Sequence, residues 1–328
     1  MDDGALKQLK QITEPKEFLN FIKPYYPTYN IKEFSIEEVE KALFHTLIKI
    51  IGKIMLFSPV TMRNFLRTYL LKYEIINIKQ IILGSIVGLS FEEKSNNTNF
   101  LVEKYLENTG FIKDLIQISN LDEIQLFMRG TRYHKAVKEG ILYFKNTHEI
   151  FVLEAFLEQL YYKTLVEDKK KYAKKENQIL STIIDCITEI YNLNMIYRGI
   201  KNNIDRKLLV QFLIKNYLFL SESEITNLLH QENIAEFLEL IDKYFKKKEN
   251  IYNLYKLIKI KREHFIWSIE GFYFEYFFKK FYFKIGDINY STIFRIIEVI
   301  LKKEKEIRFN ILPNIVKLFH EKFESLQL

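Results

Sequence analysis

A faint internal repeat constrains the fold of this chain more than any other sequence feature. The segment HEIFVLEAFLEQLYYK, from His148, matches HFIWSIEGFYFEYFFK, from His264, which begins 116 positions later (264 minus 148). The shared frame is His, Ile, an aromatic, an aliphatic, Glu, a small residue and Phe, then two aromatics and Lys. A weaker copy, VEKALFHTLIK, begins at Val39 and keeps the same spacing between Glu and Lys. Because self-similarity of this kind indicates a fold built from similar units, we expect three related units.

A second motif follows each copy. It reads EIINIKQIIL from Glu74, EIYNLNMIYR from Glu189 and EIRFNILPNI from Glu306. Its glutamate lies 34, 35 and 36 residues after the glutamate of the preceding segment. In the third copy Phe309 stands where the first two carry Asn77 and Asn192. We also expect Pro313 to shorten the third helix, because proline removes a backbone donor.

A half-repeat follows only the first two copies. It reads IQISNLDEIQLFM, ending at Met128, and LHQENIAEFLELI, ending at Ile241, whereas the 22 residues after Glu306 are too few for a third. The N-terminal segment LKQITEPKEFLNFI, ending at Ile22, carries the same Glu-Phe-Leu as the second half-repeat. We therefore predict a pseudo-threefold arrangement of three similar domains, namely residues 24–128, 129–245 and 246–328, the last completed by residues 1–23.

The secondary-structure signals are helical. No proline occurs from residue 60 to residue 312, so no residue in that range interrupts a helix by lacking its donor. Helix-start patterns are Ser35 with Glu38, Asn120 with Glu123, and Ser58 as an N-cap before Pro59. Asn-Gly hairpin turns are absent, and β-branched residues fall at helical spacing. The sequence predicts an all-α protein.

The sequence lacks the motifs that mark several classes of enzyme and binding site. The six histidines form no HExxH motif and no ligand cluster with the single cysteine, Cys186. The ten glycines form no phosphate-binding loop, and no Gly-x-Ser-x-Gly elbow is present. Charged residues interrupt every apolar run before the roughly 20 residues that a membrane span needs. We predict no catalytic residue, no cofactor and no metal site.

Polar residues of the recurring motif are the candidate functional residues: Glu74, Asn77, Glu189, Asn192 and Glu306. Polar groups in apolar helices are costly unless they are partnered. They either hold helices together or line an inner polar wall, and both interpretations stay open. Lysines at matching positions of the first segment are Lys49, Lys163 and Lys279. These lysines either face acidic partner groups or lipid headgroups, or end a helical turn in solvent.

The charge balance leaves one alternative function. Lys and Arg number 49 against 42 Asp and Glu, a net charge of +7 that favours acidic surroundings without identifying one. A helical adaptor or nucleic-acid-binding protein fits this balance. Against it, the aromatic residues fall on apolar faces of the repeats, whereas stacking on bases requires exposure.

The recurring Glu-x-x-Asn-aliphatic helix carries a family resemblance. With Arg198 closing EIYNLNMIYR and GLSFEE at residues 88–93, the chain resembles the C subunit of archaeal-type rotary ATPases, which is similar to the d subunit of vacuolar ATPases. The resemblance runs from about residue 5 to the end of the chain. Leu83 departs from it, because the first copy would carry Arg there.

This resemblance implies a non-catalytic rotor component, shaped as an all-helical funnel. One copy per complex would sit on the cytoplasmic end of the membrane proteolipid ring and receive the D and F subunits of the central stalk. It would transmit torque between the ATPase head and the ion-carrying ring, with peripheral membrane association through the ring and no nucleic-acid partner. The residues implied for the funnel framework are Glu74, Asn77, Glu189, Asn192, Arg198 and Glu306.

Overall fold

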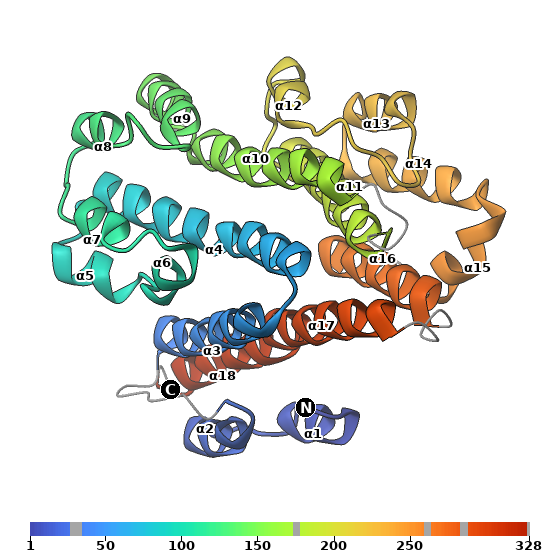
Figure 1. The fold of residues 1–328 in the computed structure, drawn as a ribbon, viewed down its shortest axis with the longest axis horizontal. Helices are drawn as coiled ribbons and strands as arrows, with labels where there is room; N and C mark the ends of the chain where they lie inside the picture. Colours follow the sequence, from blue (N-terminus) through green and yellow to red (C-terminus); the bar gives the residue numbers. More distant parts are fainter. Residues whose placement is uncertain (27–34, 173–177, 259–263, 283–287, 327–328) are drawn as a thin grey trace. The chain divides into compact units, whose positions relative to one another are not determined.

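The computed structural model describes residues 1–26, 35–172, 178–258, 264–282 and 288–326 (Figure 1). Within these ranges the regular elements are all helices, which confirms the all-α prediction. The chain forms two compact units. Unit 1 comprises Met1–Ile124 and Arg295–Leu328, and unit 2 comprises Gln125–Phe294. The division into three repeats stays a prediction.

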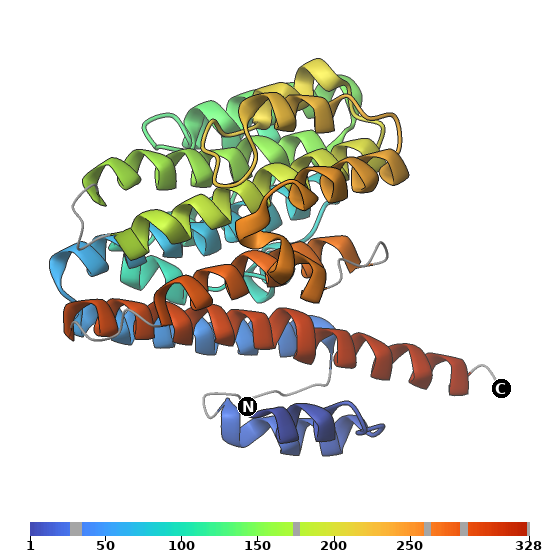
Figure 2. The same ribbon diagram turned by 90° about the vertical axis from the view of Figure 1, so that its right-hand side faces the viewer.

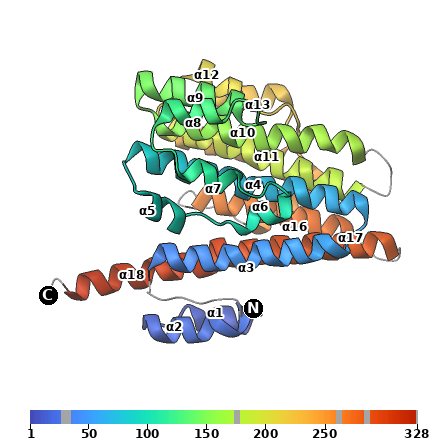
Figure 3. The same cartoon turned by 60° about the vertical axis from the view of Figure 1, so that its left-hand side comes forward.

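Unit 1 contains the two ends of the chain. Its elements are α1 (Asp3–Leu9), α2 (Pro15–Ile22), η1 (Lys23–Tyr25), α3 (Ile36–Phe57), α4 (Val60–Ile86), α5 (Phe91–Asn96), α6 (Leu101–Leu106), α7 (Phe111–Ile116), the start of α8 (Leu121–Phe127), most of α17 (Ile288–Lys305), the π-helix η5 (Glu306–Ile311) and α18 (Leu312–Leu326). Helix α3 packs on α4 and on α18, and Figure 3 shows α3 running along the red helix that ends in α18. Helix α6 also packs on both α3 and α4.

Unit 2 is built around one buried helix. Its elements are α9 (His134–Thr147), α10 (Ile150–Lys169), η2 (Lys170–Tyr172), α11 (Gln178–Lys201), α12 (Arg206–Phe212), α13 (Glu222–Leu229), α14 (Ile234–Lys246), α15 (Glu249–Ile258) and α16 (Phe265–Tyr282). Helix α11 packs on α10, α12, α13, α14 and α16. Because neighbours cover it on several sides, its sequence is apolar around most of the helix and its amphipathic pattern is weak.

Two of the three predicted helix starts are confirmed. Ser35 Oγ accepts a hydrogen bond of 3.0 Å from the N–H of Glu38, and Asn120 Oδ1 accepts one of 3.1 Å from the N–H of Glu123. The N-cap predicted at Ser58 is wrong. Its hydroxyl donates to the carbonyl of Ile54, at 2.8 Å, because Ser58 ends α3 before α4 begins.

The prediction that Pro313 shortens the third motif helix is also wrong. Figure 2 shows the red helix running without a break through η5 into α18. Three residues separate Glu306 from Asn310, whereas two separate Glu from Asn in the first two copies. A π-helical turn is the usual way for a helix to absorb one extra residue. Pro313 follows as the second residue of α18, directly after this π-helical turn.

Candidate functional site

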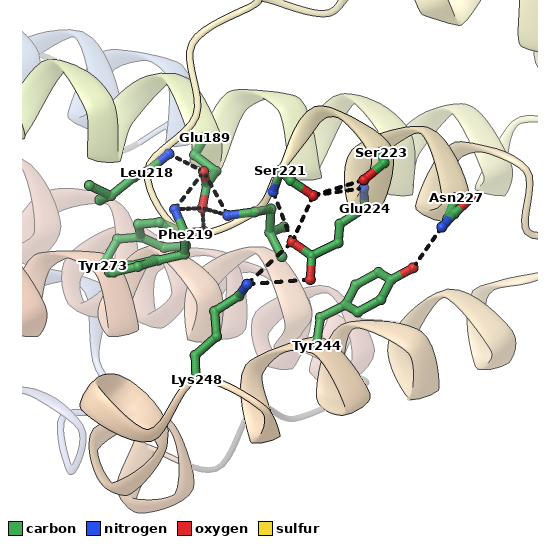
Figure 4. A network of polar contacts seen from close by, with 11 residues as sticks. Glu189, Leu218, Phe219, Ser221, Ser223, Glu224, Asn227, Tyr244, Lys248 and Tyr273 are labelled. Atoms are coloured by element: carbon green, nitrogen blue, oxygen red, sulfur yellow. Dashed lines mark hydrogen bonds and ion pairs between the residues drawn. The ribbon is translucent and has the colours of Figure 1, made fainter.

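Glu189 in α11 is fully buried, and both oxygens of its carboxylate face donors (Figure 4). It accepts hydrogen bonds from the N–H groups of Leu218, Phe219 and Leu220, at 3.0 Å for Phe219. The hydroxyl of Tyr273 in α16 donates a fourth bond of 2.5 Å. Burial raises the pKa of Glu189 to about 7, although these donors act in the opposite direction. The carboxylate therefore holds the segment before α13 against α11 and α16.

Asn192, one turn further along α11, holds the start of the same segment. Its Oδ1 accepts from the N–H of Ile214 and its Nδ2 donates to the carbonyl of Ile214, each at 2.8 Å. The neighbouring Tyr191 hydroxyl donates to the carbonyl of Phe212 at 3.1 Å. An irregular segment buries backbone groups that need partners, and these side chains provide them.

Asn77 in α4 makes the same pair of bonds in unit 1. Its Oδ1 accepts from the N–H of Asn99 at 3.0 Å, and its Nδ2 donates to the carbonyl of Asn99 at 2.9 Å. In both units the partner lies 22 residues after the asparagine. In the first two motif copies the asparagine therefore has the same structural role. It binds both backbone groups of a residue 22 positions later in the chain.

The glutamates of the two motif copies differ. Glu74, also buried, accepts a hydrogen bond of 3.0 Å from Asn108 Nδ2. The backbone in that region is bound instead by Glu103 of α6, which accepts from the N–H of Ile112 at 2.5 Å. Burial raises the pKa of Glu103 despite this bond. No sequence pattern points to Glu103, because it lies outside the repeated motif.

Glu306, the third motif glutamate, contacts the N-terminal segment. Its carboxylate accepts a hydrogen bond of 2.7 Å from the Tyr26 hydroxyl and one of 2.8 Å from Lys303 Nζ. The amino group of Met1 lies 2.6 Å from its second oxygen. Burial alone would raise the pKa of Glu306, but these donors outweigh it and lower the pKa. These contacts place the N-terminal segment beside the third motif, while the ring of three repeats stays a prediction.

Glu304, two residues earlier, was not a predicted site residue. It is buried and binds the Tyr69 hydroxyl and Lys72 Nζ of α4, with Arg308 at 3.5 Å. Burial acts to raise its pKa, but the two cations and the hydroxyl lower it to about 2. In the sequence this glutamate stands within KKEKE, a pattern typical of a solvated charge run.

Arg198 joins the two halves of the second repeat. Its guanidinium lies 3.5 Å from Glu154 and 3.3 Å from Glu158 of α10, and it stacks over the Phe151 ring at 4.9 Å. The first repeat carries Leu83 at the matching position, and a leucine cannot form this ion pair. The departure seen in the sequence thus corresponds to a real difference between the repeats.

The three candidate lysines lie in different surroundings. Lys163 is exposed and donates to Gln159 at 2.8 Å, while partial desolvation of its ammonium group and the nearby Lys135 lower its pKa. Lys279 is exposed and Lys49 is half-buried. In the part of the chain that the structure describes, no carboxylate pairs with Lys49 or Lys279. Their contact with a partner stays a prediction.

Neither a metal site nor a membrane-spanning helix is found among the described residues. No group of three His, Cys, Asp or Glu side chains among them is arranged to hold a metal ion. None of their helices has the length and hydropathy needed to cross a bilayer. The thiol of Cys186 is buried, which raises its pKa well above the usual value.

Comparison with known proteins decides the family. Residues 1–311 match the model of the ATP synthase (C/AC39) subunit family. The chain belongs to this family. The resemblance to the archaeal-type C subunit, inferred from the repeated Glu-x-x-Asn helix, is thereby confirmed.

Curated relatives carry matching names. Over 234 residues the chain is 24% identical to the C subunit of the A-type ATP synthase of Methanothermobacter thermautotrophicus, covering 70% of this chain and 59% of the relative. The corresponding protein of Methanocaldococcus jannaschii is 25% identical over 72% of this chain and 60% of its own length. That of Thermococcus kodakarensis is 22% identical over 92% and 79%. The chain thus spans about three fifths of the length of the first two relatives.

Proposed function

We propose that this protein is a non-catalytic rotor component of an A/V-type ATPase or ATP synthase. It links the D and F subunits of the central stalk to the proteolipid ring of the membrane sector, with one copy per complex. It lies on the cytoplasmic face, is peripheral to the membrane through the ring, and transmits torque for ATP-coupled ion transport. The observation that carries the proposal is the family match over residues 1–311.

The buried hydrogen bonds within each unit support this role, because they make the unit stiff. A torque-transmitting component needs units that do not deform under load more than it needs reactive groups. In each unit a buried asparagine binds both backbone groups of a distant residue, and buried carboxylates bind further donors. Buried hydrogen-bond networks in which every polar group has a partner make a fold rigid. The funnel framework that we propose comprises Glu74, Asn77, Glu189, Asn192, Arg198 and Glu306.

The test is calorimetric binding of the purified protein to the purified central-stalk pair at two salt concentrations. A nucleic acid of equal charge density is the control ligand. We expect one-to-one binding to the stalk pair that tolerates salt, and no comparable binding to nucleic acid, whose affinity would fall steeply with salt. Binding of the nucleic acid alone would reject the rotor role in favour of the nucleic-acid-binding alternative.

The lysines provide a second test of the interface. We propose that Lys49, Lys163 and Lys279 face acidic partner groups. Reversing all three charges with glutamate is expected to weaken binding to the partner proteins, because like charges would then oppose each other. If the triple variant binds the partner proteins with unchanged affinity, these lysines face solvent and do not contact a partner.

A further inference from the structure

The turn between α3 and α4 exposes the most accessible large apolar side chain of the described residues. Phe57 is 90% exposed, and its neighbours Leu56 and Val60 are 63% and 68% exposed. The surfaces of soluble proteins carry scattered single apolar residues, but a contiguous group at the end of a helix pair marks a contact site. We call Leu56, Phe57 and Val60 the apolar tip.

The charged residues that flank the apolar tip in the sequence have one sign. No acidic residue occurs between Glu40 and Glu74, whereas six cationic ones do. They are Lys41, Lys49, Lys53, Arg63, Arg67 and Lys72. Arg67 and Lys72 pair with Glu107 and Glu304, and Lys41 donates to the carbonyl of Asn96. These three cations are therefore engaged within unit 1.

The two cations nearest the apolar tip are not engaged in this way. Among the described residues, no carboxylate pairs with Lys53 or Arg63, and both side chains are exposed. Arg63 Nη2 donates to the carbonyl of Ser58 at 3.3 Å, which keeps the guanidinium beside the turn. Lys53 lies four residues before Phe57, about one helical turn of 5.4 Å behind it.

We propose that the apolar tip with Lys53 and Arg63 docks on an anionic phospholipid surface. The order of groups matches the order of layers in a bilayer leaflet: apolar side chains lie at the end of the helix pair, the Arg63 guanidinium lies beside the turn and Lys53 lies about one helical turn behind it. Interfacial elements bury apolar side chains roughly 5–10 Å deep while cations meet the headgroups. Lys53 and Arg63, with which no carboxylate of the described residues pairs, give the charge complementarity. This proposal needs only the surface of unit 1, so it stands apart from the rotor assignment.

The other end of α4 provides a matched control surface. Val87 is 68% exposed and Phe91 is 54% exposed, so a similar apolar area is presented there. The flanking residues are the acidic Glu92 and Glu93. An anionic membrane would repel this end, so its apolar side chains should not contribute to binding.

The experiment is flotation of the full chain with vesicles of phosphatidylcholine alone or mixed with phosphatidylglycerol. We expect binding to the mixed vesicles that weakens with salt. Partition should fall about tenfold or more in Leu56→Ser/Phe57→Ser and in Lys53→Glu/Arg63→Glu. The variant Val87→Ser/Phe91→Ser should bind as the unchanged protein does. Absence of binding to mixed vesicles, or binding that survives both tip variants, would overturn the proposal.

A second measurement reports insertion directly. In a Trp267→Phe background, Phe57→Trp places the only indole at the apolar tip. We expect its emission to shift to the blue with mixed vesicles, because the ring leaves water. If the tip variants instead lose binding to a lipid-free, detergent-solubilised proteolipid ring while no vesicle binding is seen, the tip is a protein contact and the lipid proposal fails. Failure of stalk binding in calorimetry would leave this result unaffected.

Discussion

The hydroxyl of Tyr26 donates a hydrogen bond of 2.7 Å to Glu306, 280 residues further along the chain. Both side chains are buried, so the bond is protected from water. It joins the N-terminal segment to the π-helical turn of the third motif. The N-terminal segment therefore depends on a contact made near the other end of the chain.

Tyr26→Phe should weaken the attachment of the N-terminal segment. The change keeps the ring and removes a donor to a buried carboxylate, which costs about 1.5–3 kcal/mol. Hydrogen exchange of residues 1–26 should become faster. Tyr25→Phe is the matched control, since Tyr25 is 37% exposed and its hydroxyl bonds to no carboxylate of the residues that the structure describes. Equal exchange in the two variants would contradict a role for the Tyr26–Glu306 bond.

Asn192→Ala should destabilise unit 2 by about 2–4 kcal/mol, measured by urea unfolding. The change leaves both the N–H and the carbonyl of Ile214 buried without their partner, and each such group costs about 1–3 kcal/mol. Asn194→Ala, two residues away on α11, is the control, because Asn194 Oδ1 has no hydrogen-bond partner among the residues that the structure describes. A similar loss of unfolding free energy in both variants would show that the effect comes from replacing a residue of α11 and not from the bonds to Ile214.

The segment before α13 should become less stable as the pH rises, because Glu189 then loses the proton that the folded state favours. Its pKa is about 7 in the folded state against an ordinary value near 4.5, so the folded state binds the proton more tightly. The stabilisation is fully present below pH 4.5 and is lost as the pH rises through 7, on the order of 3 kcal/mol. The protection of residues 213–221 against hydrogen exchange, expressed relative to the intrinsic exchange rate at each pH, should therefore fall over this range. In Glu189→Gln the protection should no longer depend on pH in this way, and an unchanged protection profile would refute the assignment.

The stability that Glu304 contributes should depend on pH in the opposite direction. Its pKa is lowered to about 2 by Lys72, Arg308 and Tyr69 acting against burial. The stabilisation is present above pH 4.5 and is lost as the pH falls through about 2. Acid unfolding of unit 1, followed by circular dichroism, should become less steep in Glu304→Gln. The exposed Glu37→Gln is the control, and a similar change in its acid transition would contradict the prediction.

Gly52→Ala should destabilise unit 1 by about 1–3 kcal/mol, through overpacking. A Cβ atom at this position would lie 2.1 Å from Tyr105 Cζ, so the Tyr105 ring, which packs directly on Gly52, would have to move. Gly271→Ala in α16 is the control, since beyond its own helix no described residue lies within 4 Å of the added atom. That variant should gain roughly 0.5–1 kcal/mol from helix propensity. Thermal unfolding of the two variants should therefore shift in opposite directions.

Sequence patterns predicted the helical class and the motif residues, because helical periodicity and capping are local properties. Asn77 and Asn192 stood out for the same reason, since a polar residue that recurs in an apolar helix needs a partner. Their partners could not be identified from the sequence. Asn99 and Ile214 are bound through their backbone, which leaves no side-chain signal.

The sequence by itself determined that the chain is all-α, that its motif recurs and that it resembles the archaeal-type C subunit. Tertiary structure alone decided which buried carboxylate meets which donor. Glu304 looks like a surface charge in the sequence, and Pro313 looks like a helix end. Burial beside Lys72 makes the first an internal ion pair, and the π-helical turn carries the helix through the second. Local pattern determines which segments become helices, whereas the pairing of charges depends on distances that only packing sets.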